Sequence, residues 1–191
     1  MRTETKTFTY YSFEELTEEA KEKAIEDFQT TMTYFDDTDS QETLTAFCKL
    51  FPVSVDNYDT DYSVINGNYY IDNGIDNLTG IRLLTYIVNN YWNDLFKPKW
   101  YYVNGHSRYS KCQFDNSCVL TGSYMDDCIL KPIYEFLLKP SDVCFEELLS
   151  DCLQAWLKAL QIDIAYQLSE EAITEALLTN EYEFTSDGTL L

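Results

Sequence analysis

Apolar residues recur three and four positions apart along much of the chain, a spacing that is typical of amphipathic helices. The clearest example runs from Ala20 to Phe35, and the longest lies between Phe145 and Ile164. Prolines and polar clusters separate these segments from one another. The spacing predicts helices over 18–35, 44–50, 77–95, 126–138, 143–168 and 169–178.

Several of these helices begin at residues that can cap a helix. Ser12 and Glu15 have the spacing of a capping box, and Thr17 is a second candidate N-cap for the first long helix. Asn77 is placed to cap the helix that follows it, and Ser169 is placed to cap the last one. Local sequence therefore predicts where the helices begin.

Five other segments have the alternation or the turn residues of strands. They are 5–11, the pair 53–65 and 69–72 on either side of Asn66–Gly67, the segment 100–103 before Asn104–Gly105, and 182–191 around Asp187–Gly188. Helices and strands are mixed without regular alternation, which predicts an α+β fold with a small antiparallel sheet and hairpins. We expect a single compact domain over 1–191, and a sub-boundary would fall near 96–125.

The charge of the chain is strongly negative. Asp and Glu number 33 against 13 Lys and Arg, a formal net charge of −20 over 191 residues. Aromatic residues are 16% of the chain, too many for a disordered acidic tail. Such a surface repels nucleic acid and anionic membranes, so we expect no direct DNA binding, no membrane association and a strongly basic partner. The start of the chain lacks an apolar signal segment, which predicts a cytoplasmic protein.

This charge is unevenly distributed. Residues 12–61 carry a net charge of −11 and residues 140–187 carry −10, whereas residues 96–114 carry +4. The basic segment 97–111 also contains Trp100 and three tyrosines, a composition typical of surfaces that stack on bases. More often, such a segment is an internal counter-charge for acidic faces, or a strand whose tyrosines pack. Whether the segment contacts RNA or only balances internal charge is left open.

Several carboxylates fall in regular rows. On a helix, residues four apart lie about 6 Å apart along the axis, as Glu14, Glu18 and Glu22 would. On a strand, residues two apart lie about 6.6 Å apart on one face, as Asp59 and Asp61 would. Such rows can imitate the close-set charges of a nucleic-acid backbone, although a solvated surface would carry the same residues. The predicted partner-binding residues are Glu14, Glu18, Glu22, Glu26, Asp36, Asp37, Asp39, Asp56, Asp59 and Asp61.

Catalytic motifs are scarce in this sequence. The chain has one histidine, His106, and lacks the signatures of P-loop, Rossmann, serine-hydrolase and zinc-protease sites. The six cysteines form no C-x-x-C pair, which favours small buried side chains over a zinc site. We therefore expect no enzyme activity, no cofactor and no bound metal. The alternative is a Mg²⁺-dependent nuclease that uses Asp36, Asp37, Asp126 or Asp127 as ligands.

Four stretches of the chain resemble sequences of other proteins. Phe13–Ile25 reads F-E-E-L-T-E-E-A-K-E-K-A-I. It is similar to the opening F-x-E-L-S-E-E-A-K-x-K-A-I of small acidic proteins encoded by phages and prophages. Leu78–Arg82 resembles the middle of these proteins, and Ser169–Ile173 and Asn180–Gly188 resemble their end. The family is loosely labelled toxin–antitoxin related, and its genes lie among counter-defence genes that include anti-CRISPR loci. The resemblance implies this context and supplies no catalytic residues.

Charge and resemblance together predict a phage-encoded counter-defence protein in the cytoplasm of a bacterial host cell. Its most concrete form is an anti-CRISPR inhibitor that binds a basic Cas9-type effector, with or without its guide RNA. Effectors of this type hold the guide–target duplex in a positively charged channel, which an acidic nucleic-acid-mimicking surface would block. The alternative based on the same charge is an antitoxin-like neutraliser of a basic toxin.

Overall fold

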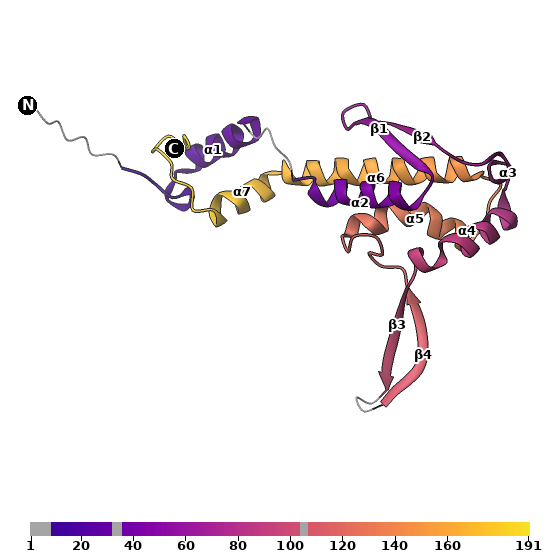
Figure 1. Cartoon of the computed structure of the whole chain (residues 1–191). Coiled ribbons are helices and arrows are strands. Elements are labelled where there is room, and N and C mark those ends of the chain that lie inside the picture. Colours follow the sequence, from indigo (N-terminus) through magenta and orange to yellow (C-terminus); the bar gives the residue numbers. More distant parts are fainter. Residues whose placement is uncertain (1–8, 32–35, 104–106) are drawn as a thin grey trace, which may run out of the picture. The chain divides into compact units, whose positions relative to one another are not determined.

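The structure is a computed structural model, and it describes residues 9–31, 36–103 and 107–191 (Figure 1). Contacts between residues divide the chain into two compact units. Unit 1 comprises Met1–Asp36 and Ile162–Leu191, and unit 2 comprises Asp37–Gln161. Unit 1 is therefore assembled from two segments that are far apart in the sequence.

Unit 1 is built around two helices. α1 (Glu18–Thr31) packs against α7 (Glu170–Thr179), and the short 3-10 helix η1 (Phe13–Glu15) also contacts α7. The inward face of α1 carries the small residues Ala20 and Ala24, which let the two helices approach closely. The buried core consists of Phe13, Leu16, Ala20, Ala24, Ile173, Leu177 and Phe184.

Capping side chains fix the starts of these helices, as the sequence predicted. The backbone N–H of Ser12 donates to the carboxylate of Glu15 at 2.9 Å and completes the capping box of η1. The hydroxyl of Thr17 accepts from the backbone N–H of Ala20 at 3.3 Å in α1. Ser169 accepts in the same way from the first turn of α7 at 3.2 Å. Each cap satisfies a backbone donor that has no partner within its helix.

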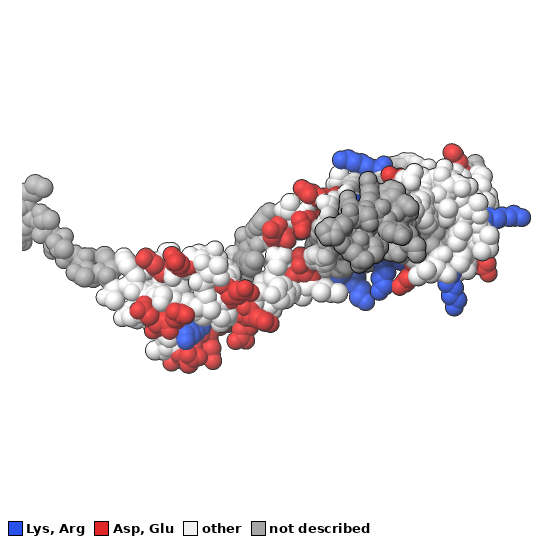
Figure 2. Space-filling view, turned by 90° about the horizontal axis from the view of Figure 1, so that it is seen from below, with Lys and Arg blue, Asp and Glu red and all other residues white. Residues whose placement is uncertain are grey.

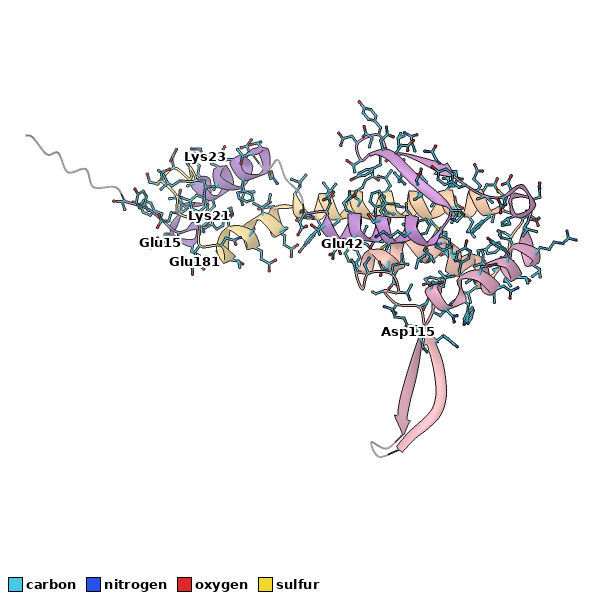
Figure 3. All side chains as sticks on the ribbon, in the orientation of Figure 1. Glu15, Lys21, Lys23, Glu42, Asp115 and Glu181 are labelled. Carbon is cyan, nitrogen blue, oxygen red and sulfur yellow. The ribbon has the colours of Figure 1, made fainter. Side chains whose placement is uncertain are left out.

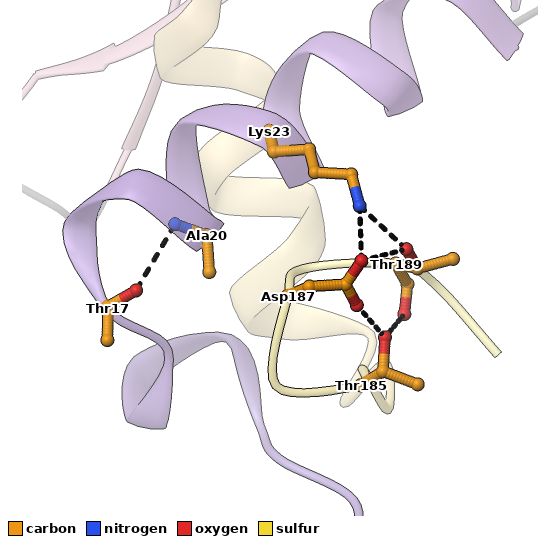
Figure 4. A network of polar contacts seen from close by, with 6 residues as sticks. All are labelled: Thr17, Ala20, Lys23, Thr185, Asp187 and Thr189. Carbon is orange, nitrogen blue, oxygen red and sulfur yellow. Dashed lines mark hydrogen bonds and ion pairs between the residues drawn. The ribbon is translucent and has the colours of Figure 1, made fainter.

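A polar network joins the C-terminal segment of unit 1 to α1 (Figure 4). The Nζ of Lys23 donates to Oδ2 of Asp187 at 2.6 Å and to the hydroxyl of Thr189 at 2.9 Å. The hydroxyl of Thr185 donates to the other carboxylate oxygen of Asp187. Lys23 first, and then the hydroxyls, hold the pKa of the Asp187 carboxyl well below its usual value.

The same segment turns back on itself where the sequence predicted a terminal strand. Tyr11 pairs with Phe184 and Phe184 with Leu190, but both are isolated bridges. The turn that ends at Gly188 reverses the chain, so regular pairing does not develop. Gly188 has a φ of +84°, and a Cβ there would lie 2.1 Å from the carbonyl oxygen of Ala20. Only glycine fits this position without a shift of the backbone.

Unit 2 is mainly helical. Its long helices are α2 (Thr38–Leu50), α4 (Gly80–Leu95), α5 (Tyr124–Leu138) and α6 (Phe145–Gln167), the last of which continues into the sequence of unit 1. The core includes Trp156, whose indole N–H donates to the carbonyl oxygen of Ser40 at 2.9 Å. The same unit also contains the fully buried Phe47, Leu83, Ile87, Leu95, Met125, Ile129, Ile133, Phe145 and Leu149.

Two antiparallel hairpins complete unit 2. β1 (Val53–Asp59) pairs with β2 (Val64–Tyr69), and β3 (Lys97–Val103) pairs with β4 (Ser107–Asp115). For 99–103, 107–113 and Asn73 the description covers the backbone and not the side chain. Helices together with small antiparallel sheets confirm the predicted α+β class.

The first hairpin turns at a different place from the predicted Asn66–Gly67. Both of these residues lie inside β2, and the chain reverses between Asp59 and Val64. The carboxylate of Asp59 accepts two backbone N–H groups of that turn, each at 2.9 Å. Gly67 serves a different purpose, because a Cβ there would lie 2.9 Å from Cδ1 of Leu153 in α6. The close approach of this leucine in α6, rather than the turn, therefore favours a small residue here.

Other differences concern the ends of the predicted elements. The single turn α3 (Asn73–Asp76) ends at Asn77, so α4 begins after Thr79 and not behind Asn77. The predicted segments over 5–8 and 32–35, and the turn at Asn104–Gly105, lie outside the described residues or extend into that part of the chain.

The division into two units differs from the expected single compact domain. The boundaries fall at 36/37 and 161/162, whereas the sequence suggested a sub-boundary near 96–125. Neither boundary has a Gly-, Pro- or Ser-rich linker, since one lies just ahead of α2 and the other inside α6. Whether both units unfold in one transition stays a prediction.

Candidate partner-binding surface

The ten predicted binding carboxylates are divided between the two units. Unit 1 contains Glu14, Glu18, Glu22, Glu26 and Asp36. Unit 2 contains Asp37, Asp39, Asp56, Asp59 and Asp61. All are exposed except Asp37, which is half-buried. The predicted set is therefore split over two separately packed units.

In unit 1 part of the predicted row of carboxylates forms on the outer face of α1, but Glu14 lies in η1 and does not continue the row. Glu18, Glu22 and Glu26 are exposed, while Ala20 and Ala24 on the opposite face are buried. Figure 2 shows acidic side chains gathered over the part of the molecule that carries α1 and α7 in Figure 1. We call the exposed carboxylates of this unit the acidic surface: Glu14, Glu15, Glu18, Glu19, Glu22, Glu26, Asp27, Asp36, Glu170, Glu171, Glu175, Glu181, Glu183 and Asp187.

The described part of unit 1 offers little charge compensation. It contains 15 acidic residues and two basic ones. Lys21 lies 2.9 Å from the carboxylate of Glu18, and Lys23 lies 2.6 Å from that of Asp187 (Figure 3 labels both lysines). Both lysines are therefore engaged inside the unit. Most of the negative charge in the described part of the unit therefore has no cationic partner among the described residues.

Sequence reasoning did not include several carboxylates of this surface among the binding residues. Glu170, Glu171 and Glu175 of α7, and Glu181 and Glu183 after it, are exposed on the same unit as α1. The last two alternate with half-buried Tyr182 and buried Phe184. The alternation of acidic and aromatic residues over 181–184 could have identified Glu181 and Glu183 from the sequence. It predicts that the carboxylates lie on one face of an extended segment.

A groove of about 660 Å³ opens between η1 and the segment that follows α7. Glu14 and Glu15 line it from η1, and Glu181 and Glu183 line it from the other segment, with three tyrosines between them. Figure 3 labels Glu15 and Glu181 at this site. The groove brings together residues from both sequence segments of unit 1.

In unit 2 most of the predicted aspartates hold the fold together. Asp56 accepts from the side-chain amide of Asn68 in β2 at 2.7 Å. Asp39 accepts from the hydroxyl of Ser123, the N-cap of α5, at 3.2 Å. Asp37 accepts from the side chain of Gln41 one turn along α2 at 3.0 Å.

The predicted pair Asp59 and Asp61 does not form a row on a strand. Asp59 is the last residue of β1 and its carboxylate caps the turn, in which Asp61 itself lies. The expectation that both project from one strand face is therefore wrong. The expectation failed because the sequence placed the hairpin turn at Asn66–Gly67, whereas the chain reverses between Asp59 and Val64.

Asp126, a candidate metal ligand, is fully buried and already saturated with donors. Its oxygens accept from the backbone N–H groups of Leu120, Thr121 and Gly122, and from the hydroxyls of Thr43 and Thr121, at 2.7–2.9 Å. Burial acts to raise the pKa of Asp126, but these hydrogen bonds outweigh it and lower the pKa below its usual value. The carboxylate therefore orders the loop before α5 and ties it to α2.

The remaining carboxylates of the nuclease alternative have similar roles. Asp127 accepts from the backbone N–H of Cys118 at 2.8 Å, and Asp37 is held by Gln41. Over the described ranges, no group of three or more His, Cys, Asp or Glu side chains could hold a metal ion. Asp127 and Asp37 thus contribute to the local structure around Cys118 and at the start of α2.

The side chains of the basic segment are described only at its start, at Lys97 and Pro98. Lys97 donates to the carbonyl oxygen of Cys118 at 2.6 Å, and the other cationic side chains of 97–111 belong to the part without described side chains. The question of RNA contact versus counter-charge is therefore untested. Cys152 is fully buried, and burial raises the pKa of its thiol, as expected for a small core residue. The other described cysteines are free thiols that are half-buried.

Comparison of the chain with protein-family models, with curated proteins and with solved structures finds no match. In the part of the chain that the structure describes, no helix has the length and apolar character needed to cross a bilayer. The inference of function therefore rests on the residues of this chain, above all on the acidic surface of unit 1.

Proposed function

We propose that this protein binds a basic, nucleic-acid-handling protein through the acidic surface of unit 1 and blocks its access to nucleic acid. The observation that carries the proposal is the composition of the described part of the unit, which has 15 acidic residues and two basic ones. Both basic residues are lysines that form ion pairs with carboxylates of the same unit. In the phage context that the resemblance implies, a Cas9-type effector is the most concrete partner.

The arrangement of the charges supports imitation of nucleic acid over simple solubility. Like charges four apart on a helix destabilise it by about 0.2–0.5 kcal/mol per pair, and α1 keeps Glu18, Glu22 and Glu26 in such a row. A merely soluble surface would carry comparable numbers of both charges, whereas the described part of unit 1 has two lysines for 15 acidic residues. Carboxylates about 6 Å apart along the axis meet the cations of a nucleic-acid channel at close intervals.

The first test is the salt dependence of binding to a purified Cas9-type effector with its guide RNA. Affinity should fall steeply between about 50 and 500 mM salt, because screening weakens exposed charge pairs. Target DNA should compete for the same surface. Binding that is insensitive to salt and to DNA would contradict the proposal, and cleavage of DNA by the purified protein with Mg²⁺ would favour the nuclease alternative.

The second test locates the surface with two matched sets of substitutions. Glu18→Gln, Glu22→Gln and Glu26→Gln together should slow association with the effector, since complementary charge mainly sets the association rate. The control changes the α7 residues Glu170, Glu171 and Glu175 in the same way. We expect this control to reduce stability modestly, because carboxylates in the first turn favour the helix dipole, and to change binding less. A stronger binding defect in the control would move the interface from α1 to α7.

A further inference from the structure

Net charge alone does not explain how the acidic surface would select one basic partner from many. The groove between η1 and the segment after α7 combines carboxylates with aromatic rings, which net charge does not require. We propose that this groove receives an arginine side chain of the partner and anchors it there. The inference deepens the proposed function, on which it rests, by naming the side chain that the surface recognises.

The groove has a rigid base. The backbones of Tyr11 and Phe184 exchange two hydrogen bonds of 2.9 Å, which place the segments before η1 and after α7 side by side. The rings of Phe184 and Phe13 lie 6.0 Å apart between their centres, and Phe13 and Leu177 are buried beneath the groove. The lining residues are therefore held on a packed core and need no rearrangement to meet a ligand.

Tyrosine rings form part of the lining. Tyr11 and Tyr182 are half-buried and pack against the core, and the ring of Tyr182 lies 6.0 Å from that of Phe28. Tyr10 is 49% exposed beside them. Fixed aromatic faces attract a cation through the ring quadrupole, and arginine uses this interaction more often than lysine.

The carboxylates of the groove are available for a cation. Glu14, Glu181 and Glu183 are exposed, and none forms an ion pair with another described residue. Glu15 differs, because it already accepts the N–H of Ser12. A planar guanidinium can meet a carboxylate with two parallel hydrogen bonds while its face lies on an aromatic ring, and an ammonium group can do neither as well. The volume of about 660 Å³ accommodates such a side chain.

The test compares hexa-arginine and hexa-lysine peptides, titrated by calorimetry into the full chain at one ionic strength. The arginine peptide should bind about threefold to tenfold more tightly. In the double variant Glu14→Gln, Glu183→Gln the ratio of the two affinities should fall to about one. The matched control Glu22→Gln, Glu26→Gln removes the same charge outside the groove and should weaken both peptides by one common factor.

The aromatic contribution has its own pair of variants. Tyr182→Phe keeps the ring and should keep the arginine preference, whereas Tyr182→Leu should lose it, with thermal unfolding used to verify that each variant is folded. Equal affinity of the two peptides for the unchanged protein would overturn the groove proposal and leave the proposed function standing. The groove proposal would also be overturned, and the proposed function left standing, if the groove variant and the control variant lost affinity for the two peptides equally. Absence of binding by either peptide at low salt would overturn both.

Discussion

The Nζ of Lys23 lies 2.6 Å from Oδ2 of Asp187, although the two residues are 164 positions apart in the chain. This contact closes the C-terminal turn onto α1 and at the same time engages one of the two lysines in the described part of unit 1. A substitution that removes this contact would therefore change both the stability of unit 1 and the charge of its surface.

We predict that Asp187→Asn destabilises unit 1 at neutral pH and has less effect in acid. Lys23 and Thr185 lower the pKa of the folded carboxyl, so its stabilisation is present above the ordinary pKa of about 3.9 and is lost as the pH falls below that value. Thermal midpoints of the two proteins, measured from pH 7 to pH 2, should converge in acid. Glu183→Gln, at an exposed carboxylate, is the control that should leave the midpoint unchanged.

Gly188→Ala should destabilise the protein by more than about 2 kcal/mol, because it adds a backbone clash to the strain of a left-handed conformation. Gly122→Ala is the matched control. Its φ is +97°, but nothing lies within 4 Å of the added Cβ, so it should cost only about 1 kcal/mol. Denaturant unfolding measures both values. Equal effects would show that the close approach to Ala20 contributes nothing.

Asp126→Asn should destabilise unit 2 by about 2–4 kcal/mol, because an amide cannot accept all the hydrogen bonds that the buried carboxylate receives. Its neighbour Asp127 is exposed and accepts one backbone N–H, so Asp127→Asn should cost less than about 1 kcal/mol. Urea unfolding distinguishes the two. The penalty at Asp126 should shrink as the pH falls below about 4, since its folded pKa is lowered.

Asp59 and Asp61 were predicted to act together, and the structure now predicts different consequences for them. Asp59→Ala removes the acceptor for two backbone N–H groups of the hairpin turn and should cost about 0.5–2 kcal/mol. Asp61→Ala removes an exposed side chain from the turn and should change stability by less than about 0.5 kcal/mol. Comparable losses in unfolding experiments would contradict the capping role of Asp59.

Local signals in the sequence were sufficient where a residue acts within its own segment. Ser12 with Glu15, Thr17 and Ser169 cap the predicted helices because capping involves only neighbours three or so positions away. Gly67 shows the limit of this reasoning. Its neighbour Asn66 suggested a hairpin turn, but the glycine instead lies close to Leu153 of a distant helix, a contact that no local pattern reveals.

The same distinction applies to the acidic surface. The row Glu18, Glu22 and Glu26 follows from helical periodicity, and the structure exposes all three. The groove carboxylates Glu181 and Glu183 become neighbours of η1 only because distant backbone segments form a bridge at Phe184. Net charge identified the character of the surface, and tertiary pairing determined which carboxylates form the groove.

The two-segment construction of unit 1 has a consequence for the order of events on the ribosome. Helix α1 is synthesised early, but its packing partner α7 follows only after the whole of Asp37–Gln161 has been translated. At elongation rates of about 5–20 residues per second this delay is on the order of ten seconds, during which unit 2 can fold and α1 has no partner. The acidic groove thus comes into existence last, so an incomplete nascent chain cannot present it.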